Sequence, residues 1–264
     1  MRILISPAKT LDFESAPVTR KHSAPRFLDD STALVDLLRP KPASDIASLM
    51  QISDALAELN ARRFSEWSPP FDRHNAKQAV LAFKGDVYTG LEADAFTAAD
   101  FDWAQKHLRI LSGLYGVLRP LDLIQPYRLE MGTRLPNERG NDLYAFWRAR
   151  ITASLKEELE AQRSPLTVNL ASQEYFGAVD ARALPGPLVT PVFKDLHKGS
   201  YKIISFFAKK ARGAMARWII KSRVRSAQGL QAFAEDGYAL NPSLTAEAAD
   251  GALVFTRDQP PNPS

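Results

Sequence analysis

The chain has 264 residues, of which 45% are apolar, and a formal net charge of +4. This apolar content is enough for a sizeable core, while the absence of cysteine excludes disulfides, thiolate metal sites and thiol nucleophiles. The longest apolar runs are far shorter than the ~20 residues of a membrane-spanning helix, and Met1–Ile5 runs directly into Ser6 and Pro7. Neither a signal peptide nor a membrane span is expected, and the reducing cytoplasm is the expected compartment.

Short apolar runs and stretches of helical spacing follow one another along the chain. The apolar runs predict buried strands at Arg2–Ile5, Ala79–Phe83, Leu166–Leu170, Leu188–Lys194, Tyr201–Phe206, Tyr238–Leu240 and Ala252–Phe255. The helical spacing predicts helices at 31–39, 45–64, 101–108, 142–159 and 204–223. Residues 109–112 fit either a last helical turn or a new strand. The runs 188–194 and 201–206 are joined by a polar turn, which suggests a hairpin.

The order of these elements predicts the fold class. No internal repeat and no long linker divides the chain, so we expect one α+β domain over residues 1–258. Its sheet is expected to be mixed, largely antiparallel and flanked by helices. Residues 259–264 are rich in proline and are expected to form a disordered tail.

The positive charge is concentrated in one late segment. From Lys198 to Arg225 there are nine Lys or Arg and no Asp or Glu, so the rest of the chain carries 25 basic and 30 acidic residues. On a helix over 204–223 the apolar side chains fall within an arc of about 140°. The cations that fill the remainder are Lys209, Lys210, Arg212, Arg217, Lys221 and Arg223.

This segregation of charge predicts a polyanion-binding surface. The cations have no acidic neighbour on their own helix, so phosphates of a bound nucleic acid would neutralise them. We therefore expect a nucleic acid, held through its phosphates by Lys209, Lys210, Arg212, Arg217 and Lys221. The alternative is a solvated helix whose cations pair with acidic residues elsewhere in the chain. Gly213, inside the helix, indicates a close approach to another backbone.

A second candidate element is the turn from Gly113 to Gly116. Helical spacing before it and Val117 to Arg119 after it resemble a helix-hairpin-helix, in which backbone N–H groups hold a phosphate. Gly113, Gly116 and Arg119 are the residues expected to contact DNA there. The Gly-x-x-Gly spacing also fits a backbone clamp of the KH type or a plain tight turn.

Polar residues are dense just after several predicted strands. Loops at strand ends are where α/β proteins place binding sites, so these side chains could converge in one pocket. A carboxylate partnered by Lys or Tyr can act as general acid or base, and aromatic rings can stack a nucleobase. The candidates for such an enzyme are Glu130, Glu174, Lys84 and Tyr175. The alternative is that these residues satisfy buried loop backbone.

No metal or cofactor is predicted. The four histidines, His22, His74, His107 and His197, lie far apart and show no metal-ligand spacing. No Gly-x-Ser-x-Gly, Walker loop or dinucleotide-binding fingerprint is present. The residues alone therefore favour a binding protein over an enzyme.

Several longer strings resemble the YaaA family. They are 5–11 (ISPAKTL), 82–91 (AFKGDVYTGL), 111–122 (LSGLYGVLRPLD), 126–132 (PYRLEMG), 169–172 (NLAS) with Glu174-Tyr175, and 208–213 (AKKARG). The resemblance implies a cytosolic protein, induced by hydrogen peroxide, that limits unincorporated iron and so protects DNA from Fenton chemistry. It also implies a DNA-binding surface, a helix-hairpin-helix-like element and an unusual α+β fold.

Three functional hypotheses follow. The first is a peroxide stress protein that binds double-stranded DNA without sequence preference through the basic helix. The second is an enzyme acting on a nucleobase, nucleotide or damaged nucleic acid, with Glu130 or Glu174 as acid or base. The third is an adaptor that docks another protein through the stripe containing Phe207 and Trp218.

Overall fold

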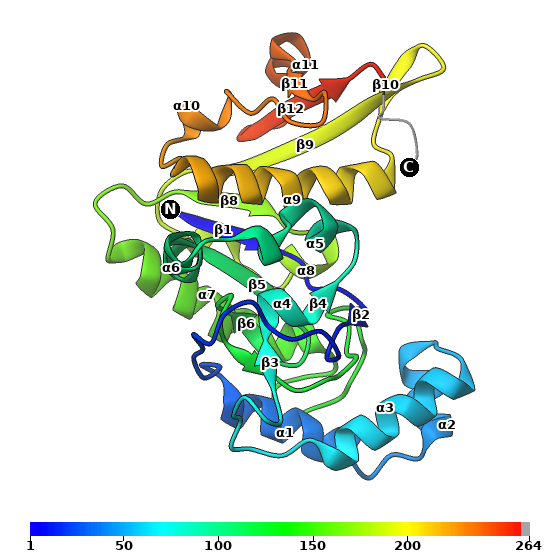
Figure 1. Ribbon diagram of the computed structural model, residues 1–264. Helices are drawn as coiled ribbons and strands as arrows, with labels where there is room; N and C mark the ends of the chain where they lie inside the picture. Colours follow the sequence, from blue (N-terminus) through cyan, green and yellow to red (C-terminus); the bar gives the residue numbers. More distant parts are fainter. Residues whose placement is uncertain (260–264) are drawn as a thin grey trace.

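The computed structural model describes residues 1–259, and Figure 1 shows a twisted central sheet surrounded by helices. Within these residues the sheet has eight strands in the order β11-β12-β9-β8-β1-β5-β6, with β10 paired to β9. The strands are β1 (Arg2–Ile5), β5 (Leu108–Ser112), β6 (Gly116–Leu118), β8 (Thr167–Leu170), β9 (Leu188–His197), β10 (Ser200–Lys202), β11 (Ala239–Leu240) and β12 (Ala252–Arg257). The predicted α+β class and mixed sheet are confirmed.

The centre of the sheet is parallel, which corrects the expectation of a largely antiparallel sheet. β12, β9, β8, β1 and β5 all run in the same direction. Only β6, β10 and β11 are antiparallel, each on one neighbour. Helices connect the central strands, and a strand that returns through a crossover helix pairs in parallel. The predicted hairpin is confirmed, because β10 turns back onto β9.

β1 occupies a special position in this sheet. Its neighbours are β5 on one side and β8 on the other, with Ile3 opposite both Leu108 and Val168. The chain leaves β1 toward β5 and later crosses back to form β8 on the opposite side. In parallel sheets, a crevice opens at the carboxyl ends of strands where the direction of winding reverses in this way.

The helix α9 (Ser205–Ser222) is the predicted basic helix, and it packs on β1, β8 and β9. In Figure 1 it lies across the front of the sheet with α5 (Asp86–Leu91) beside it. A Cβ atom added at Gly213 would lie 1.8 Å from the Val87 carbonyl oxygen, and one at Gly90 2.0 Å from that of Lys210. The close approach predicted from Gly213 is therefore confirmed, and only glycine permits it.

The remaining helices surround the sheet. They are α1 (Leu28–Leu38), α2 (Ala43–Met50), α3 (Asp54–Glu66), α4 (Ala79–Ala82), α6 (Ala98–His107), α7 (Leu143–Glu160), α8 (Gln173–Phe176), α10 (Ala227–Leu230) and α11 (Pro242–Ala246). α1, α2 and α3 form a layer at the lower end of Figure 1. The predicted helix 45–64 is two helices, because Gln51 adopts a left-handed conformation with φ of 53°.

Residues 79–83 correct another expectation. Instead of a buried strand they form the single turn α4, held between β3 (Lys77–Gln78), which pairs with β7 (Leu123–Ile124), and β4 (Phe83–Lys84), which pairs with β2 (Thr10–Leu11). The whole turn is buried. A short, continuously apolar run has no periodicity that separates a helix from a strand, so packing decides its conformation.

The segment around Gly113 forms no helix-hairpin-helix. β5 and β6 pair as an antiparallel hairpin, with Ser112 opposite Gly116. Gly116 has φ of +67°, and the Trp147 ring of α7 packs against it so closely that a Cβ atom would lie 2.6 Å from a ring carbon. The residues from Leu111 to Leu118 are all buried, so the backbone N–H groups of this turn are not open to a phosphate.

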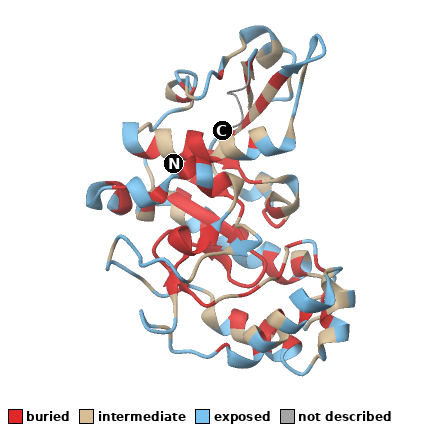
Figure 2. Cartoon of the chain, turned by 45° about the vertical axis from the view of Figure 1, so that its right-hand side comes forward, coloured by how far each residue is buried: buried red, intermediate tan, exposed pale blue. Residues whose placement is uncertain are grey.

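One hydrophobic core extends from Met1 to Phe255. Figure 2 shows it as a continuous band of buried residues along the middle of the molecule. Within the described residues no helix has the length and apolarity needed to cross a membrane. The expected tail falls almost entirely on 260–264, outside the described residues.

Candidate ligand pocket at the strand ends

A cavity of about 480 Å³ lies at the carboxyl ends of β1 and β8. Ser6 follows β1 directly, and Ser172 stands two residues after β8. The Ser6 Oγ accepts a hydrogen bond from the Ser172 backbone N–H at 2.9 Å and donates one to the Ser172 Oγ at 3.3 Å. These bonds join the two strand ends at the floor of the crevice that the topology opens.

The cavity is lined by residues from four separate parts of the chain. They are Ser6–Thr10, Lys84–Tyr88, Ser172, Glu174 and Tyr175, and Lys209 with Arg212. The convergence of strand-end polar residues expected from the sequence is therefore present. Of the four predicted acid–base candidates, Lys84, Glu174 and Tyr175 line the cavity, and Glu130 is linked to it through an ion pair with the lining residue Lys9.

Two local pairings bring these segments together. β2 and β4 pair with Thr10 opposite Lys84, which places the loop after β1 beside the start of α5. The glycine contact between α5 and α9 then sets Lys209 and Arg212 across from the same loop. Backbone contacts between β2 and β4 and between α5 and α9 thus place the polar side chains of the site.

Arg212 is the least compensated charge in the cavity. Its side chain is half-buried, and within the described residues its guanidinium has no ion-pair or hydrogen-bond partner. Burial lowers the pKa of Arg212, although a guanidinium remains charged at any physiological pH. A half-buried, unpaired cation is costly, so an anionic ligand would be stabilising here.

The other cations of the cavity have nearby carboxylates. Lys9 forms an ion pair with Glu130 at 2.8 Å, Lys84 lies 3.6 Å from Asp12, and Lys209 lies 4.0 Å from Asp86. The three lysine side chains are between 54% and 67% exposed. Such exposed pairs contribute little to stability, which leaves the lysines available to a ligand.

The two candidate carboxylates are held in defined positions. The Glu174 Oε1 accepts a hydrogen bond from the Gly132 N–H at 3.0 Å. Glu130 pairs with Arg128 at 3.0 Å as well as with Lys9. Both carboxylates also line a neighbouring cavity of about 790 Å³.

Buried tyrosines form the apolar side of the site. Tyr88 donates a hydrogen bond to the Ser6 carbonyl oxygen at 3.2 Å, and its ring lies 5.5 Å from that of Phe83. Burial raises the pKa of Tyr88 and of Tyr175 well above the usual value, and so does the nearby phenol of Tyr127. These phenols therefore remain protonated donors at neutral pH.

The predicted cationic face of α9 is only partly present. Arg217 is ion-paired with Glu92 and Glu235, and its side chain is only 16% exposed. Arg223 is paired with Asp100 at 2.7 Å. Lys221 remains exposed, and Lys210 is half-buried. Other segments thus supply the counter-ions of Arg217 and Arg223, as the alternative of a solvated helix expected for these two residues, whereas Lys210, Arg212 and Lys221 have no ion-pair partner within the described residues.

The three residues predicted to contact a phosphate near the Gly113 turn do not lie together on an open surface. Gly113 and Gly116 are buried in the β5–β6 hairpin, and the Gly113 carbonyl oxygen accepts a hydrogen bond from the Trp147 indole at 2.8 Å. Arg119 pairs with Asp122 at 2.9 Å and lines another cavity, at the opposite edge of the sheet. Across residues 1–259 no three His, Asp or Glu side chains gather in an arrangement suited to a metal ion.

Sequence reasoning missed two parts of the molecule. Ser6 is not among the predicted site residues, although its position directly after a predicted strand indicates a place at the edge of the sheet where ligands bind. The cations at the opposite edge were also missed, because Arg2, Arg26 and Arg109 are far apart in the sequence and have no shared motif.

Fold and site together define an α+β protein with a cationic ligand pocket at the switch point of a mixed sheet. Comparison with known proteins gives its family. A family model described as "Peroxide stress protein YaaA" matches residues 1–244. A protein of Cellvibrio japonicus (strain Ueda107), named only as a UPF0246 protein, is 58% identical over 257 residues, covering 97% of this chain and 98% of that protein. The chain therefore belongs to the peroxide stress protein YaaA family.

Proposed function

We propose that this protein acts in cytoplasmic resistance to hydrogen peroxide by binding a nucleotide-type phosphate ligand in the strand-end pocket. The observation that carries the proposal is the half-buried, unpaired Arg212 in a cavity that also contains Lys84 and Lys209. A guanidinium binds a phosphate through two parallel hydrogen bonds, and the exposed lysines add charge. Peroxide damages nucleobases and nucleotides. A phosphorylated nucleotide is therefore a ligand that fits both the cationic pocket and the peroxide-stress role of the family.

The pocket also has the groups needed for chemistry on such a ligand. Glu174 lies in the cavity wall as a positioned carboxylate, and Tyr175 is a protonated phenol. A carboxylate can accept a proton as general base, and a phenol that stays protonated can donate a hydrogen bond to a developing negative charge. An activity on a damaged nucleobase or nucleotide is therefore part of this proposal.

Arg212→Gln tests the proposal. We expect the affinity for a nucleoside 5′-monophosphate, measured by calorimetry, to fall about 10- to 100-fold, because a charge-assisted hydrogen bond contributes roughly 1.5–3 kcal/mol. Arg62→Gln removes an equal charge from the exposed side of α3 and should leave the affinity for the nucleotide unchanged. Equal affinity for the nucleoside without phosphate, or unchanged binding by Arg212→Gln, would contradict the proposal.

Glu174→Gln separates binding from catalysis. The substitution keeps the shape of the side chain but removes the carboxylate that could accept a proton. If the pocket is catalytic, this variant should retain ligand affinity and lose protection of peroxide-treated cells. Normal protection would leave the pocket a binding site only.

DNA binding is the second candidate function, and the exposure of Lys209 and Lys221 on α9 favours it. In this proposal the protein covers DNA without sequence preference while unincorporated iron is limited, as the family resemblance implies. Arg217 contributes little, because Glu92 and Glu235 neutralise it. The remaining helix cations Lys209, Lys210 and Lys221 would contact about three phosphates, which predicts a slope of log K against log[salt] near −2.7.

A pair of variants tests this second candidate by a salt titration on a short duplex. Lys209→Ala/Lys221→Ala should weaken binding and make the slope less negative, because two phosphate contacts are lost. Arg217→Ala should leave the slope unchanged. A flat salt dependence in the unmodified protein would exclude phosphate contacts altogether.

A further inference from the structure

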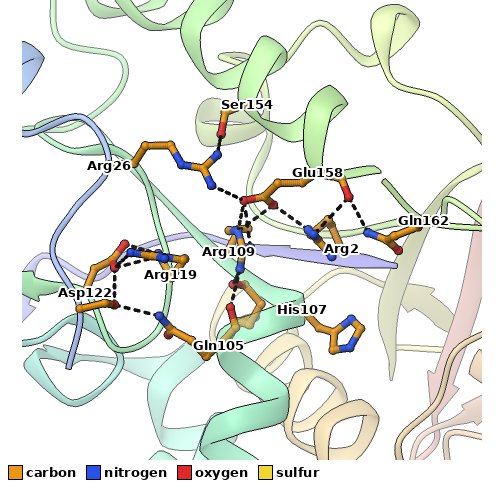
Figure 3. A network of polar contacts seen from close by, with 12 residues as sticks. Arg2, Arg26, Gln105, His107, Arg109, Arg119, Asp122, Ser154, Glu158 and Gln162 are labelled. Carbon is orange, nitrogen blue, oxygen red and sulfur yellow. Dashed lines mark hydrogen bonds and ion pairs between the residues drawn. The ribbon is translucent and has the colours of Figure 1, made fainter. Parts of the chain in front are cut away.

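A second cavity, of about 800 Å³, lies at the opposite edge of the same sheet, where β1 and β5 begin. Figure 3 shows part of its wall from close by. Seven cationic side chains line it, and Glu158 of α7 is the one carboxylate among its lining residues. The cations are Arg2, Arg26, Lys106, Arg109, Arg119, Arg163 and Arg225. We call this cavity the amino-edge pocket.

Glu158 holds three of these cations together. Its carboxylate pairs with Arg2 at 2.6 Å, with Arg109 at 2.9 Å and with Arg26 at 3.2 Å. Arg2 and Arg109 are 12% and 6% exposed, and Glu158 is 9% exposed, whereas Arg26 is 39% exposed. One negative charge therefore faces three positive charges on a largely buried floor, and two positive charges remain uncompensated.

The walls add further positive charge. Lys106, Arg163 and Arg225 are exposed and have no ion-pair partner within the described residues. Arg119 is neutralised from outside the cavity by Asp122, at 2.9 Å. The cations converge from six segments of the chain, and mutual repulsion across a shared, partly buried space raises the free energy of the unliganded state.

His107 lies among these cations at the edge of the cavity. Its ring stacks on Trp103, with centroids 4.0 Å apart, and its Nδ1 lies 3.0 Å from the Met1 carbonyl oxygen. Burial lowers the pKa of His107 to about 4, and the charges of the N-terminal amino group, Arg2 and Arg225 act in the same direction. The histidine is therefore neutral at pH 7 and offers no charge of its own to an anion.

We propose that the amino-edge pocket binds a linear polyphosphate group, such as the phosphate chain of a nucleoside triphosphate or inorganic tripolyphosphate. A single phosphate is too small to reach cations on every wall of so wide a cavity. Duplex DNA is a rigid rod, and it would meet Lys106 and Arg225 but not the sunken Arg2 and Arg109. A flexible chain of two or three phosphates enters the cavity and contacts both floor and walls. This site is separate from the strand-end pocket and does not depend on the function proposed for it.

The test is calorimetric titration of the full chain with tripolyphosphate, pyrophosphate and orthophosphate. Affinity should rise by at least tenfold from orthophosphate to tripolyphosphate. Lys106→Gln/Arg225→Gln removes two exposed, unpaired cations that are outside the Glu158 network, and should weaken tripolyphosphate binding at least tenfold. Arg62→Gln/Arg73→Gln removes the same charge from exposed positions elsewhere and should have no effect. Equal affinity for the three anions, or equal binding by both double variants, overturns the proposal.

Three further measurements test this site against its alternatives. Arg212→Gln should leave tripolyphosphate binding intact, and if it alone abolishes binding the anion occupies the strand-end pocket instead. A short DNA duplex should not displace tripolyphosphate, and displacement through Lys106 and Arg225 would identify a nucleic-acid site. In proton NMR, tripolyphosphate should raise the pKa of His107.

Discussion

The pockets at the two edges of the sheet are both cationic, but they differ in how many of their cations have carboxylate partners. At the carboxyl edge the lysines have carboxylates nearby, and Arg212 is the cation without a partner in the described part of the chain. At the amino edge seven cations surround Glu158 alone. The carboxyl-edge pocket therefore has both signs of charge with which to orient a ligand, whereas the amino-edge pocket has an excess of positive charge spread over its floor and walls, which suits an extended anion.

This contrast shows that topology and charge locate sites independently. The reversal of winding at β1 opens the carboxyl-edge crevice whatever side chains line it. No such rule places a pocket at the amino edge, and there the concentration of arginine is the signal. Both observations come from one sheet, so variants at one edge serve as controls for the other.

Glu158→Gln should have the largest effect on stability. It leaves Arg2, Arg26 and Arg109 without their shared carboxylate, and breaking a buried ion pair in this way costs about 3–5 kcal/mol. Urea unfolding should show that loss, with partial recovery in tripolyphosphate. Glu174→Gln is the matched variant at the carboxyl edge and should cost less than about 1 kcal/mol, because the Gln Oε1 can still accept the hydrogen bond from the Gly132 N–H. If both variants lost the same free energy of unfolding, Glu158 would not be offsetting repulsion among the three arginines.

Gly213→Ala should have the next largest effect, and it should act on the carboxyl edge alone. The added methyl group would meet the Val87 carbonyl oxygen and push α9 away from α5, at a cost of about 1–3 kcal/mol. Because Arg212 and Lys84 stand on the two sides of this contact, nucleotide affinity should fall as well. Gly132→Ala is the control, since its Cβ atom would make an ordinary 3.4 Å contact with Glu174. Tripolyphosphate binding should persist in both variants.

Much of the fold was predictable from local pattern. β1, β8 and β12 and the helices α6, α7 and α9 lie where the sequence predicted them, because each has a clear apolar period or run. The prediction of a strand at residues 79–83 is wrong, since the four apolar residues of the turn α4 have no period. The parallel direction of the central strands was missed because pairing depends on contacts between distant segments.

The candidate site divides in the same way. Convergence of Lys84, Glu174 and Tyr175 was predictable because strand ends in one sheet meet at one edge. The pairing of Arg217 with Glu92 and Glu235 was not, because neither acid lies on the same helix. The Glu158 network was equally hidden, since its members are separated by up to 156 residues. Sequence shows which charges lack local partners, and only the fold supplies the distant ones.

The smallest predicted effect concerns pH, and it arises at the amino edge. His107 has a folded-state pKa of about 4 against an ordinary 6.5, so the unfolded chain takes up a proton first as the pH falls. Stability from this group is complete above pH 6.5 and is lost between pH 6.5 and pH 4. Allowing for partial exposure, the loss at pH 5 should be about 1 kcal/mol, measured by urea unfolding against His107→Gln, which should lack it.

A bound polyphosphate should reduce this pH dependence. Negative charge near Arg2 and Arg225 would offset the repulsion that opposes protonation of His107, raise its pKa and narrow the difference from the unfolded chain. The loss of stability between pH 6.5 and pH 5 should therefore be smaller with tripolyphosphate present, once the overall stabilisation by binding is subtracted. A nucleotide bound at the carboxyl edge should leave it unchanged, because His107 lines only the amino-edge pocket among the cavities described. If both ligands reduced the loss of stability between pH 6.5 and pH 5 equally, the two edges would not be electrostatically independent.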